Sequence, residues 1–490
     1  MKEKTSATLI KANRSFKWTT IAEVAAKIMA PIINMVLARF IAPEIFGIVA
    51  SISIIVSFAE LFSEGGFSRF IVQKEFEKDD SLKKYSGTAN ISTIAISILI
   101  FFIILFFRNN LSKVVGASGY EYYLVLAAVQ IPAFGFCSIQ TAVAKRKFEF
   151  KKLSIVRILV VVLRLAVSLI FALANRPIEA LVLGTVIPAV AQSLILIIMY
   201  RKDVSFRFSF TKLREMFTLS ILFLGESFVS WLSTSIGTFL IVYYFDQTTN
   251  GLYKNAFSTV SGIVAIVVAI YSSIMVSLLS RTQNDRATFS KIILKYQRII
   301  SFITIPMGFG IFFYKDFLTS VFFGSGWEDA AIIVGLFGIG LSFNASLTIF
   351  IMTAFTSLGK PIWNILINAI TTIGVILSFV LFAKYGFTYF MISRICVFFI
   401  VGLCSMLLMF LVLKTNPLPM LYNLFIPFAL SLPMSAFAVF QQNVKSGLVF
   451  NAIGIISCII IYFVEFYFSK PDSFKDFLKL ALGREISLEN

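Results

Sequence analysis

Long apolar stretches dominate this sequence and limit how the chain can fold. A bilayer core about 30 Å thick needs about 20 apolar residues per helix. The 490 residues contain fourteen stretches of about that length, separated by charged or Pro- and Gly-rich breaks. We therefore expect an all-α polytopic membrane protein. The expected spans are 17–39, 46–64, 86–107, 120–144, 154–174, 178–200, 217–241, 252–280, 293–314, 329–353, 361–383, 388–413, 421–440 and 447–468.

The composition agrees with a membrane protein and removes much catalytic chemistry. Hydrophobic residues make up 58% of the chain and charged residues only 14%, which does not suit a water-soluble globule. No histidine is present, so Ser-His-Asp hydrolysis, Cys-His nucleophiles and zinc sites with histidine ligands are excluded. The four cysteines lie far apart in apolar runs without a CxxC pair, which indicates packing and not a disulfide or metal site.

Lysine and arginine are distributed unevenly between the two sets of loops. With the N-terminus in the cytoplasm, 32 of the 43 Lys and Arg residues fall in cytoplasmic segments, 7 in the opposite loops and 4 within spans. Because cytoplasmic loops are enriched in these residues, both termini are predicted to lie in the cytoplasm. The predicted location of the protein is the cell membrane. The net charge of +18 then reflects topology and contact with anionic lipid headgroups, and no nucleic-acid partner is expected.

A weak internal repeat suggests the domain organisation. Residues 39–47 align with 243–251 at an offset of 204, and 138–153 align with 348–363 at an offset of 210. Six spans separate the copies, so the copies would share one orientation about an axis along the membrane normal. Chance similarity between apolar helices is the alternative. The expected parts are two pseudo-symmetric six-helix lobes at 1–215 and 216–415, two additional spans at 416–468 and a cytoplasmic tail at 469–490, with the character of an interfacial amphipathic helix.

Several ionisable side chains fall inside the expected spans, where a charge is costly unless it faces a polar cavity or a partner. Glu23 and Lys27 lie four residues apart on one helix face, with Asn34 on the same stripe. Glu60 and Glu226 each lie beside a stripe of Ser and Thr residues. Arg39, Arg164 and Arg394 are basic residues within or at the ends of spans, and Arg157 shares a helix face with Arg164 but is expected at the cytoplasmic interface. Together these groups predict a shared, water-filled cavity between the lobes.

Simpler explanations exist for each of these charges. Glu23 and Lys27 could form an ion pair with each other. Arg39, Arg164 and Arg394 could extend toward lipid headgroups. The serine stripes could serve helix packing.

Two segments around the second span carry a family resemblance. The runs are 37–50, Leu-Ala-Arg-Phe-Ile-Ala-Pro-Glu-Ile-Phe-Gly-Ile-Val-Ala, and 58–73, Phe-Ala-Glu-Leu-Phe-Ser-Glu-Gly-Gly-Phe-Ser-Arg-Phe-Ile-Val-Gln. The chain resembles the polysaccharide-transporter family of Wzx-type lipid-linked oligosaccharide flippases, in the superfamily that includes multidrug exporters and the lipid II flippase. One departure is conservative, since Glu64 stands before Gly65 and Gly66 where the family has Asp.

The resemblance implies a V-shaped cavity between spans 1 to 6 and 7 to 12, alternating access, and a polyprenyl diphosphate carrying a sugar repeat unit as substrate. Substrate-binding residues would be Lys27, Arg39, Arg164, Arg394 and Asn34, with arginine favoured for contacts to the diphosphate. Glu23, Glu60 and Glu226 would balance these charges or couple transport to Na⁺ or H⁺. No catalytic residue, resident cofactor or metal site is expected.

The sequence thus predicts a flippase, not an enzyme, that moves its substrate from the cytoplasmic to the outer leaflet for lipopolysaccharide or exopolysaccharide synthesis. Membrane lipids, a polysaccharide polymerase and glycosyltransferases are the expected partners. One alternative is a cation-coupled multidrug or organic-cation exporter of the same fold, which the near balance of cavity charges opposes. A second is a membrane-embedded glycosyl-transferring polymerase, which the short external loops oppose.

Overall fold

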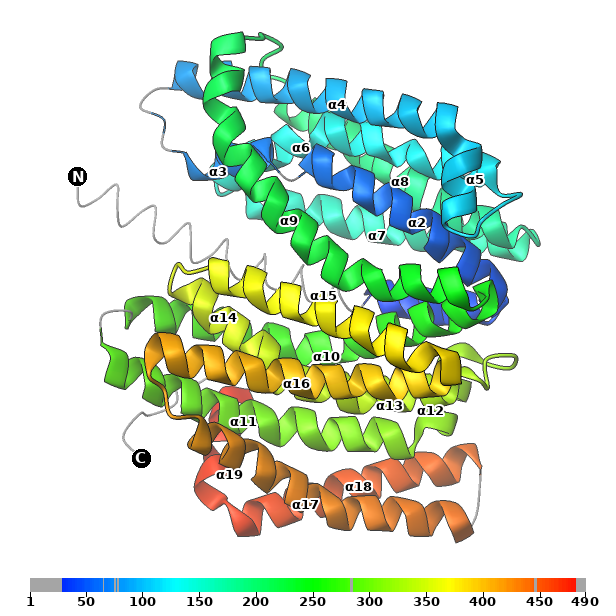
Figure 1. Ribbon diagram of the computed structural model, residues 1–490, viewed down its shortest axis with the longest axis vertical. Helices are drawn as coiled ribbons and strands as arrows, with labels where there is room; N and C mark the ends of the chain where they lie inside the picture. Colours follow the sequence, from blue (N-terminus) through cyan, green and yellow to red (C-terminus); the bar gives the residue numbers. More distant parts are fainter. Residues whose placement is uncertain are drawn as a thin grey trace. The chain divides into compact units, whose positions relative to one another are not determined.

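The structure, a computed structural model, describes residues 29–64, 66–74, 76, 79–282, 285–444 and 447–481 (Figure 1). Within these residues all regular secondary structure is helical. Thirteen described segments are long and apolar enough to cross a bilayer, and they correspond to the second to fourteenth expected spans. The first expected span lies mostly outside the described residues, and its described end is the helix Met29–Ala38. The predicted all-α polytopic class is confirmed, whereas Glu23 and Lys27 lie outside the described residues.

The chain divides into two compact units between Lys254 and Asn255. The helices that lie wholly in the first unit, after Met29–Ala38, are α2 (Pro43–Glu64), α3 (Phe67–Gln73), α4 (Asp79–Val114), α5 (Glu121–Ala128), α6 (Gln130–Arg146), α7 (Phe150–Leu173), α8 (Pro177–Tyr200) and α9 (Phe210–Tyr244).

Helix α10 (Gln247–Arg281) crosses the boundary into the second unit. The second unit continues with α11 (Arg286–Phe313), α12 (Lys315–Phe323), α13 (Ala330–Asn344), a π-helical turn η1 (Ala345–Ile349), α14 (Phe350–Ser357), α15 (Ile362–Phe382), a 3₁₀ turn η2 (Ala383–Tyr385), α16 (Phe387–Leu413), α17 (Pro417–Val444), α18 (Leu448–Ser469) and α19 (Pro471–Ala481).

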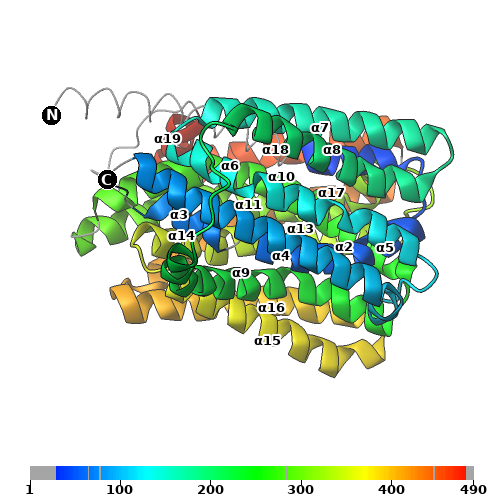
Figure 2. The ribbon, with the colours of Figure 1, turned by 90° about the horizontal axis from the view of Figure 1, so that it is seen from above.

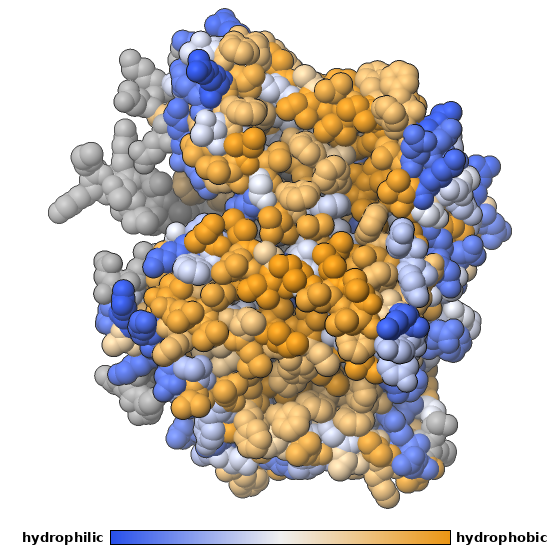
Figure 3. Space-filling model, viewed as in Figure 1, coloured by the Kyte–Doolittle hydropathy of each residue, from blue (hydrophilic) through white to orange (hydrophobic). Residues whose placement is uncertain are grey.

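On the face shown in Figure 3, apolar side chains cover the middle of the helices, while hydrophilic side chains gather at the helix ends. Phe106 and Tyr243, for example, are 79% and 75% exposed. A water-soluble protein rarely exposes so much continuous apolar surface. Lipid tails therefore form the natural surroundings of these faces.

Two helices of the first unit are longer than the expected spans. Helix α4 has 36 residues and begins at Asp79, and α9 has 35 residues and begins at Phe210. Helix α4 is kinked at Phe107. At about 1.5 Å per residue, α9 is roughly 50 Å long and the part of α4 before its kink roughly 40 Å, and both exceed the thickness of a bilayer core, about 30 Å. The starts of both helices therefore extend the folded part of the first unit past the apolar region.

Helix α9 packs within the first unit, on α2, α3 and α4. In Figure 2 it lies away from α7 and α8, which run side by side. The predicted second lobe, 216–415, instead includes most of α9. The two units are defined by their compactness and the two lobes by the internal repeat, so the boundary of the units does not test the lobes. The lobes 1–215 and 216–415 therefore stay a prediction.

The repeat offset of 204 residues has a structural counterpart where α2 meets the start of α10. A methyl group added to Gly47 would overlap the carbonyl oxygen of Gln247, and one added to Gly251 would overlap that of Pro43. Residues 43 and 47 become 247 and 251 under the offset, so the two contacts exchange, as they do in a two-fold symmetric interface. Asn250 Nδ2 also donates to the Gly47 carbonyl oxygen at 3.0 Å.

The described part of the tail forms helix α19, which has one apolar face. Phe474 and Phe477 lie against Phe463 and Phe466 of α18, with ring centroids 5.3–6.4 Å apart. Asp476 Oδ2 forms an ion pair with Lys295 Nζ of α11 at 3.0 Å. The tail is therefore anchored to the second unit by aromatic packing and by a partly buried charge pair.

Candidate functional site

The first unit contains a pocket of about 840 Å³ between α2, α3, α6, α7, α8 and α9. Among the described residues, four charged side chains line it, namely Glu60, Arg69, Lys145 and Arg157. The polar side chains of its lining are Ser57, Ser68, Gln73, Ser138, Thr141, Ser154, Gln192 and Ser227. The lining thus combines three cations and one carboxylate with many uncharged hydrogen-bonding groups.

Helix α3 brings Arg69 to this pocket. Its apolar residues Phe70 and Ile71 are buried, and they pack with residues of α4, α6 and α9. The start of α3 approaches α9 so closely that a Cβ atom at Gly66 would lie 2.8 Å from Ser220 Cβ, which explains a glycine at this position. Burial of one face leaves Ser68, Arg69 and Gln73 to line the pocket.

The end of α3 is fixed by Arg146 of α6. Its Nη1 atom donates to the carbonyl oxygens of Ile71 at 3.1 Å and Val72 at 3.4 Å, and also to that of Lys74. The last carbonyls of a helix lack partners within the helix, so a guanidinium is an effective cap. The Arg146 guanidinium also lies over the Phe76 ring, 4.6 Å from its centroid.

Arg69 forms an ion pair with Glu226 of α9. Its Nη1 atom lies 2.8 Å from Glu226 Oε2, and its guanidinium carbon lies 5.9 Å from the centroid of the Phe223 ring. The Arg69 and Glu226 side chains are 44% and 33% exposed. Exposed pairs contribute roughly 0–1 kcal/mol. The pair therefore orients the Arg69 side chain, but it is weak enough to leave the positive charge of Arg69 available to a ligand.

Lys145 and Arg157 flank the turn between α6 and α7. Phe148, with φ of 54°, reverses the chain there. Glu149 accepts hydrogen bonds from Lys152 Nζ at 2.8 Å and from the Tyr200 hydroxyl at 2.6 Å. Burial acts to raise the pKa of Glu149, but the hydrogen bonds from Lys152 and Tyr200 outweigh it and hold the pKa below its usual value.

Helix α9 is held to α2 by aromatic contacts at the side of the pocket. Trp231 Nε1 donates to Ser57 Oγ at 3.0 Å. The Trp231 ring centroid lies 5.1 Å from that of Phe58 and 6.2 Å from that of Phe228, with which Trp231 stacks. Phe58 and Phe228 remain 37% and 40% exposed. An amphipathic wall thus adjoins the polar lining.

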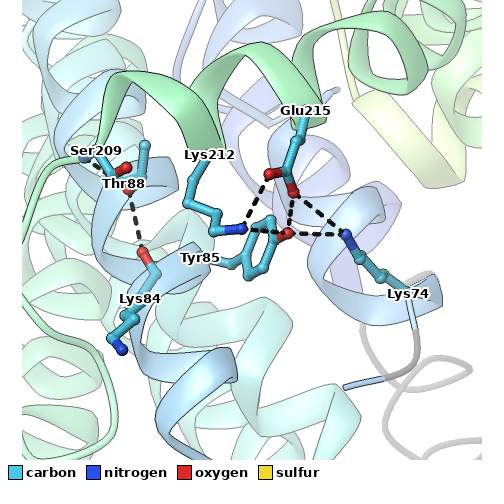
Figure 4. Close-up of polar contacts among 7 residues, drawn as sticks. All are labelled: Lys74, Lys84, Tyr85, Thr88, Ser209, Lys212 and Glu215. Atoms are coloured by element: carbon cyan, nitrogen blue, oxygen red, sulfur yellow. Dashed lines mark hydrogen bonds and ion pairs between the residues drawn. The ribbon is translucent and has the colours of Figure 1, made fainter. Parts of the chain in front are cut away.

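A second polar cluster joins the start of α9 to α4 and to the end of α3 (Figure 4). The Tyr85 hydroxyl donates to Glu215 Oε2 and accepts from Lys74 Nζ at 3.0 Å and Lys212 Nζ at 3.1 Å. Lys212 also pairs with Glu215 at 2.9 Å. Both ammonium groups lie over the Tyr85 ring, 4.3 and 4.7 Å from its centroid.

The structure brings only some of the sequence-predicted residues to the pocket. Glu60 lines it, and Glu226 adjoins it through Arg69. Asn34 is partly buried on the helix Met29–Ala38, Arg39 is exposed just after that helix, and Arg164 is partly buried on α7, but none of these three lines the pocket.

Arg394 belongs to α16 in the second unit. Its side chain is only 4% exposed, and its guanidinium carbon lies 6.0 Å from the Phe398 ring centroid. The guanidinium therefore lies in the interior of that unit and not on its lipid-facing surface. Its predicted role in substrate binding stays a prediction.

Arg69 and Lys145 are not among the predicted site residues, because both fall in segments that the distribution of Lys and Arg assigns to the cytoplasmic loops. The segment 65–85 was expected to be a loop, whereas it contains the helix α3 and the start of α4. A signal was present, since Phe67, Phe70 and Ile71 have helical spacing and Arg69 lies off that apolar face. Arg157 had been assigned to the interface and not to a site.

The site is suited to binding an anion. Guanidinium groups offer paired N–H donors that match phosphate oxygens, and Lys145 supplies a compact third charge. The surrounding hydroxyl and amide groups can hydrogen-bond a polyhydroxylated molecule. The arrangement therefore favours a ligand that combines an anionic group with many polar groups.

Comparison with solved structures places this fold among membrane transporters. The lipid II flippase MurJ in an inward closed conformation superposes with a TM-score of 0.75 at 16% identity, covering 95% of this chain and 99% of that one. An inward-facing multidrug resistance transporter of the MATE family in the MOP superfamily superposes with a TM-score of 0.65 at 13% identity, covering 79% and 94%. The protein is thus a polytopic membrane protein whose fold resembles the folds of these two proteins.

The sequence defines the family. Residues 36–332 match the family described as polysaccharide biosynthesis protein, and the chain belongs to that family. The succinoglycan biosynthesis transport protein ExoT of Rhizobium meliloti (strain 1021) is 20% identical over 368 residues, 74% of this chain and 73% of that protein. An uncharacterized membrane protein in the cps region of Klebsiella pneumoniae is 21% identical over 322 residues, 65% of each chain. The family resemblance found in the sequence is confirmed.

Proposed function

We propose that the protein is a flippase that moves a polyprenyl-diphosphate-linked oligosaccharide from the cytoplasmic to the outer leaflet of the cell membrane. The observation that carries this proposal is the pocket with three cations in a chain of the polysaccharide biosynthesis family. The description of ExoT as a transport protein for a polysaccharide supports the same class of activity.

The physical need for such a protein follows from the substrate. Moving one unpaired polar group into hydrocarbon costs roughly 2–7 kcal/mol, so an oligosaccharide with many hydroxyls does not cross a bilayer unaided. A polar pocket between helices removes that cost. Each negative charge moved out of a negative interior also gains about 2.3 kcal/mol per 100 mV, which favours export.

In this proposal the pocket of the first unit holds the diphosphate. Arg69 and Arg157 make paired contacts with phosphate oxygens, Lys145 adds a point charge, and Glu60 limits the net charge of the empty site. The exposed rings of Phe58 and Phe228 adjoin the part of the lining that carries Ser57 and Ser227. Arg39, Arg164, Arg394, Asn34 and Lys27 stay proposed as further contacts, and Glu23 and Glu226 stay proposed as charge-balancing or ion-coupling groups.

Accumulation of substrate in cells tests the proposal. Cells that lack this protein should accumulate lipid-linked oligosaccharide in the cytoplasmic leaflet and lose the corresponding surface polysaccharide. The wild-type gene should restore both, and a gene encoding Arg69→Gln, Lys145→Gln and Arg157→Gln together should not. Normal surface polysaccharide in the deletion strain would refute the proposal.

The same strains separate the two alternative functions. A multidrug exporter would change resistance to organic cations without changing the polysaccharide, but the cationic lining opposes such a substrate. If the protein were a polymerase, the deletion strain would accumulate substrate in the outer leaflet, and the purified protein would form sugar bonds. The proposed orientation, with both termini cytoplasmic, and the partnership with a polymerase and glycosyltransferases belong to the same proposal.

A further inference from the structure

We propose that Glu226 competes with the substrate's diphosphate for Arg69, so that substrate binding detaches the middle of α9 from α3. This inference rests on the proposed function. It assigns Arg69 two exclusive partners, namely the Glu226 carboxylate in the empty protein and an anionic phosphate group in the loaded one. Glu226 is then a positioning residue, because occupancy of the pocket determines whether Glu226 holds α9 to α3.

The geometry of the pair supports an exchange. Arg69 lines the pocket, whereas Glu226 lies at its side and is followed by Ser227, which lines it. The 2.8 Å contact uses Arg69 Nη1 and a single carboxylate oxygen, Glu226 Oε2. The guanidinium therefore keeps further N–H donors, so an entering phosphate can bind before the carboxylate leaves.

The strengths of the two interactions favour the substrate. Both side chains of the pair are exposed to a third or more, and such pairs are weak because water competes with them. A diphosphate carries at least two negative charges and meets Arg157 and Lys145 in the same lining. Phosphate oxygens also match the planar guanidinium in a bidentate way. The substrate therefore displaces one carboxylate with a stronger set of contacts.

Loss of the pair loosens one of several ties, meaning side-chain contacts, that join α9 to its neighbours. At one end α9 remains joined to Tyr85 through Lys212 and Glu215, and further along Trp231 remains bonded to Ser57. Glu226 lies between these two ties. Release there frees the middle of a 35-residue helix while its flanking contacts persist, which is the behaviour of a bending element and not of local unfolding.

Binding measurements on the purified full chain in lipid nanodiscs test this inference, with inorganic pyrophosphate and farnesyl diphosphate as probes. Glu226→Gln keeps the size of the side chain but removes the competing charge. We expect about fivefold tighter binding, which corresponds to about 1 kcal/mol. Glu226→Asp should return the affinity toward the wild-type value. Glu179→Gln is the matched control, because it removes a carboxylate of the same unit that lies outside the pocket lining and outside the contacts of α9, and it should leave the affinity unchanged.

A double substitution separates exchange from general electrostatics. Arg69→Gln should weaken binding at least fivefold, and Glu226→Gln should have no further effect in that background. Transport by Glu226→Gln should be slower than wild type although binding is tighter, because α9 can no longer re-form its tie. A merely structural role would weaken both.

Three results would overturn the inference, and they differ in their consequence for the proposed function and the proposed site. Unchanged or weaker binding by Glu226→Gln, with Arg69→Gln still weakening it, would end the exchange and leave the proposed function standing. The same tightening in the Arg69→Gln background would show a long-range charge effect instead. No binding of either probe by the wild-type chain would remove both the exchange and the proposed site.

Discussion

Arg69, Lys145 and Arg157 carry the chemistry at the scale of single residues. Each comes from a different helix, and buried neighbours or turn contacts hold the backbone beside each of them. Glu60 and Glu226 could be found from the sequence, because a carboxylate inside an apolar stretch stands out. Lys145 could not, because a basic residue between spans has the same appearance whether it faces solvent or a pocket. For Arg69 the signal was the helical spacing of its apolar neighbours Phe67, Phe70 and Ile71.

Substitution of single cations should weaken binding of a prenyl diphosphate. We expect Lys145→Gln and Arg157→Gln each to reduce affinity about three- to tenfold, as loss of one charge-assisted contact implies. The measurement is binding by the purified protein as a function of salt concentration. Lys151→Gln, on the same stretch of chain but outside the pocket lining, is the control. Equal affinities for all variants would contradict the assignment of the pocket.

Glu149 gives a pH-dependent prediction. Because its pKa is lower in the folded protein, its stabilising effect is present above its usual value of 4.5 and is lost as the pH falls through the lowered pKa. Glu149→Gln should therefore lower the Tm at pH 7, by loss of about 1 kcal/mol of screened, charge-assisted hydrogen bonding. The difference in Tm from wild type should shrink toward zero as the pH falls from 4.5 through the lowered pKa of Glu149. A difference that is constant with pH would show that the charge of Glu149 is irrelevant.

At the scale of helices, the close approach of Gly47 and Gly251 makes a test of the repeat. Gly251→Ala forces α2 and α10 apart, because the new methyl group would overlap the Pro43 carbonyl, and overpacking of this kind costs about 1–3 kcal/mol. Gly47→Ala should have a similar effect, because the two contacts exchange under the offset. Thermal unfolding in detergent measures both.

Gly225 of α9 is the control for these substitutions. A Cβ atom there would meet nothing within 4 Å. Gly225→Ala should leave the Tm unchanged or raise it, because alanine has the higher helix propensity. A loss of stability at Gly225 equal to that at Gly251 would contradict the steric explanation.

Helix existence was predictable here, while helix ends and short helices were not. Thirteen spans follow from apolar length alone, because a bilayer fixes the length that a helix needs. The starts of α4 and α9 extend beyond the apolar region and leave no hydropathy signal. Helix α3, with seven residues, is stabilised mainly by packing on α4, α6 and α9 and by Arg146, and such tertiary stabilisation is not visible in a local window.

For the whole molecule, the distribution of Lys and Arg predicts which loops face the cytoplasm. In a background without the native cysteines, Lys202→Cys should react with a membrane-impermeant maleimide only after permeabilisation. Glu328→Cys, exposed between α12 and α13, should react in intact cells. The reverse pattern would contradict the orientation and with it the proposed direction of transport.

Reconstitution tests the central claim most directly. Purified protein is placed in liposomes with a fluorescent prenyl-diphosphate oligosaccharide, and the fraction that an external sugar-modifying reagent reaches is followed over time. Wild-type protein should make the inner-leaflet substrate accessible within minutes, and the Arg69→Gln, Lys145→Gln, Arg157→Gln variant should resemble empty liposomes. Equal transport by both proteins would contradict the account, because the basic pocket of the first unit would then have no part in moving the substrate.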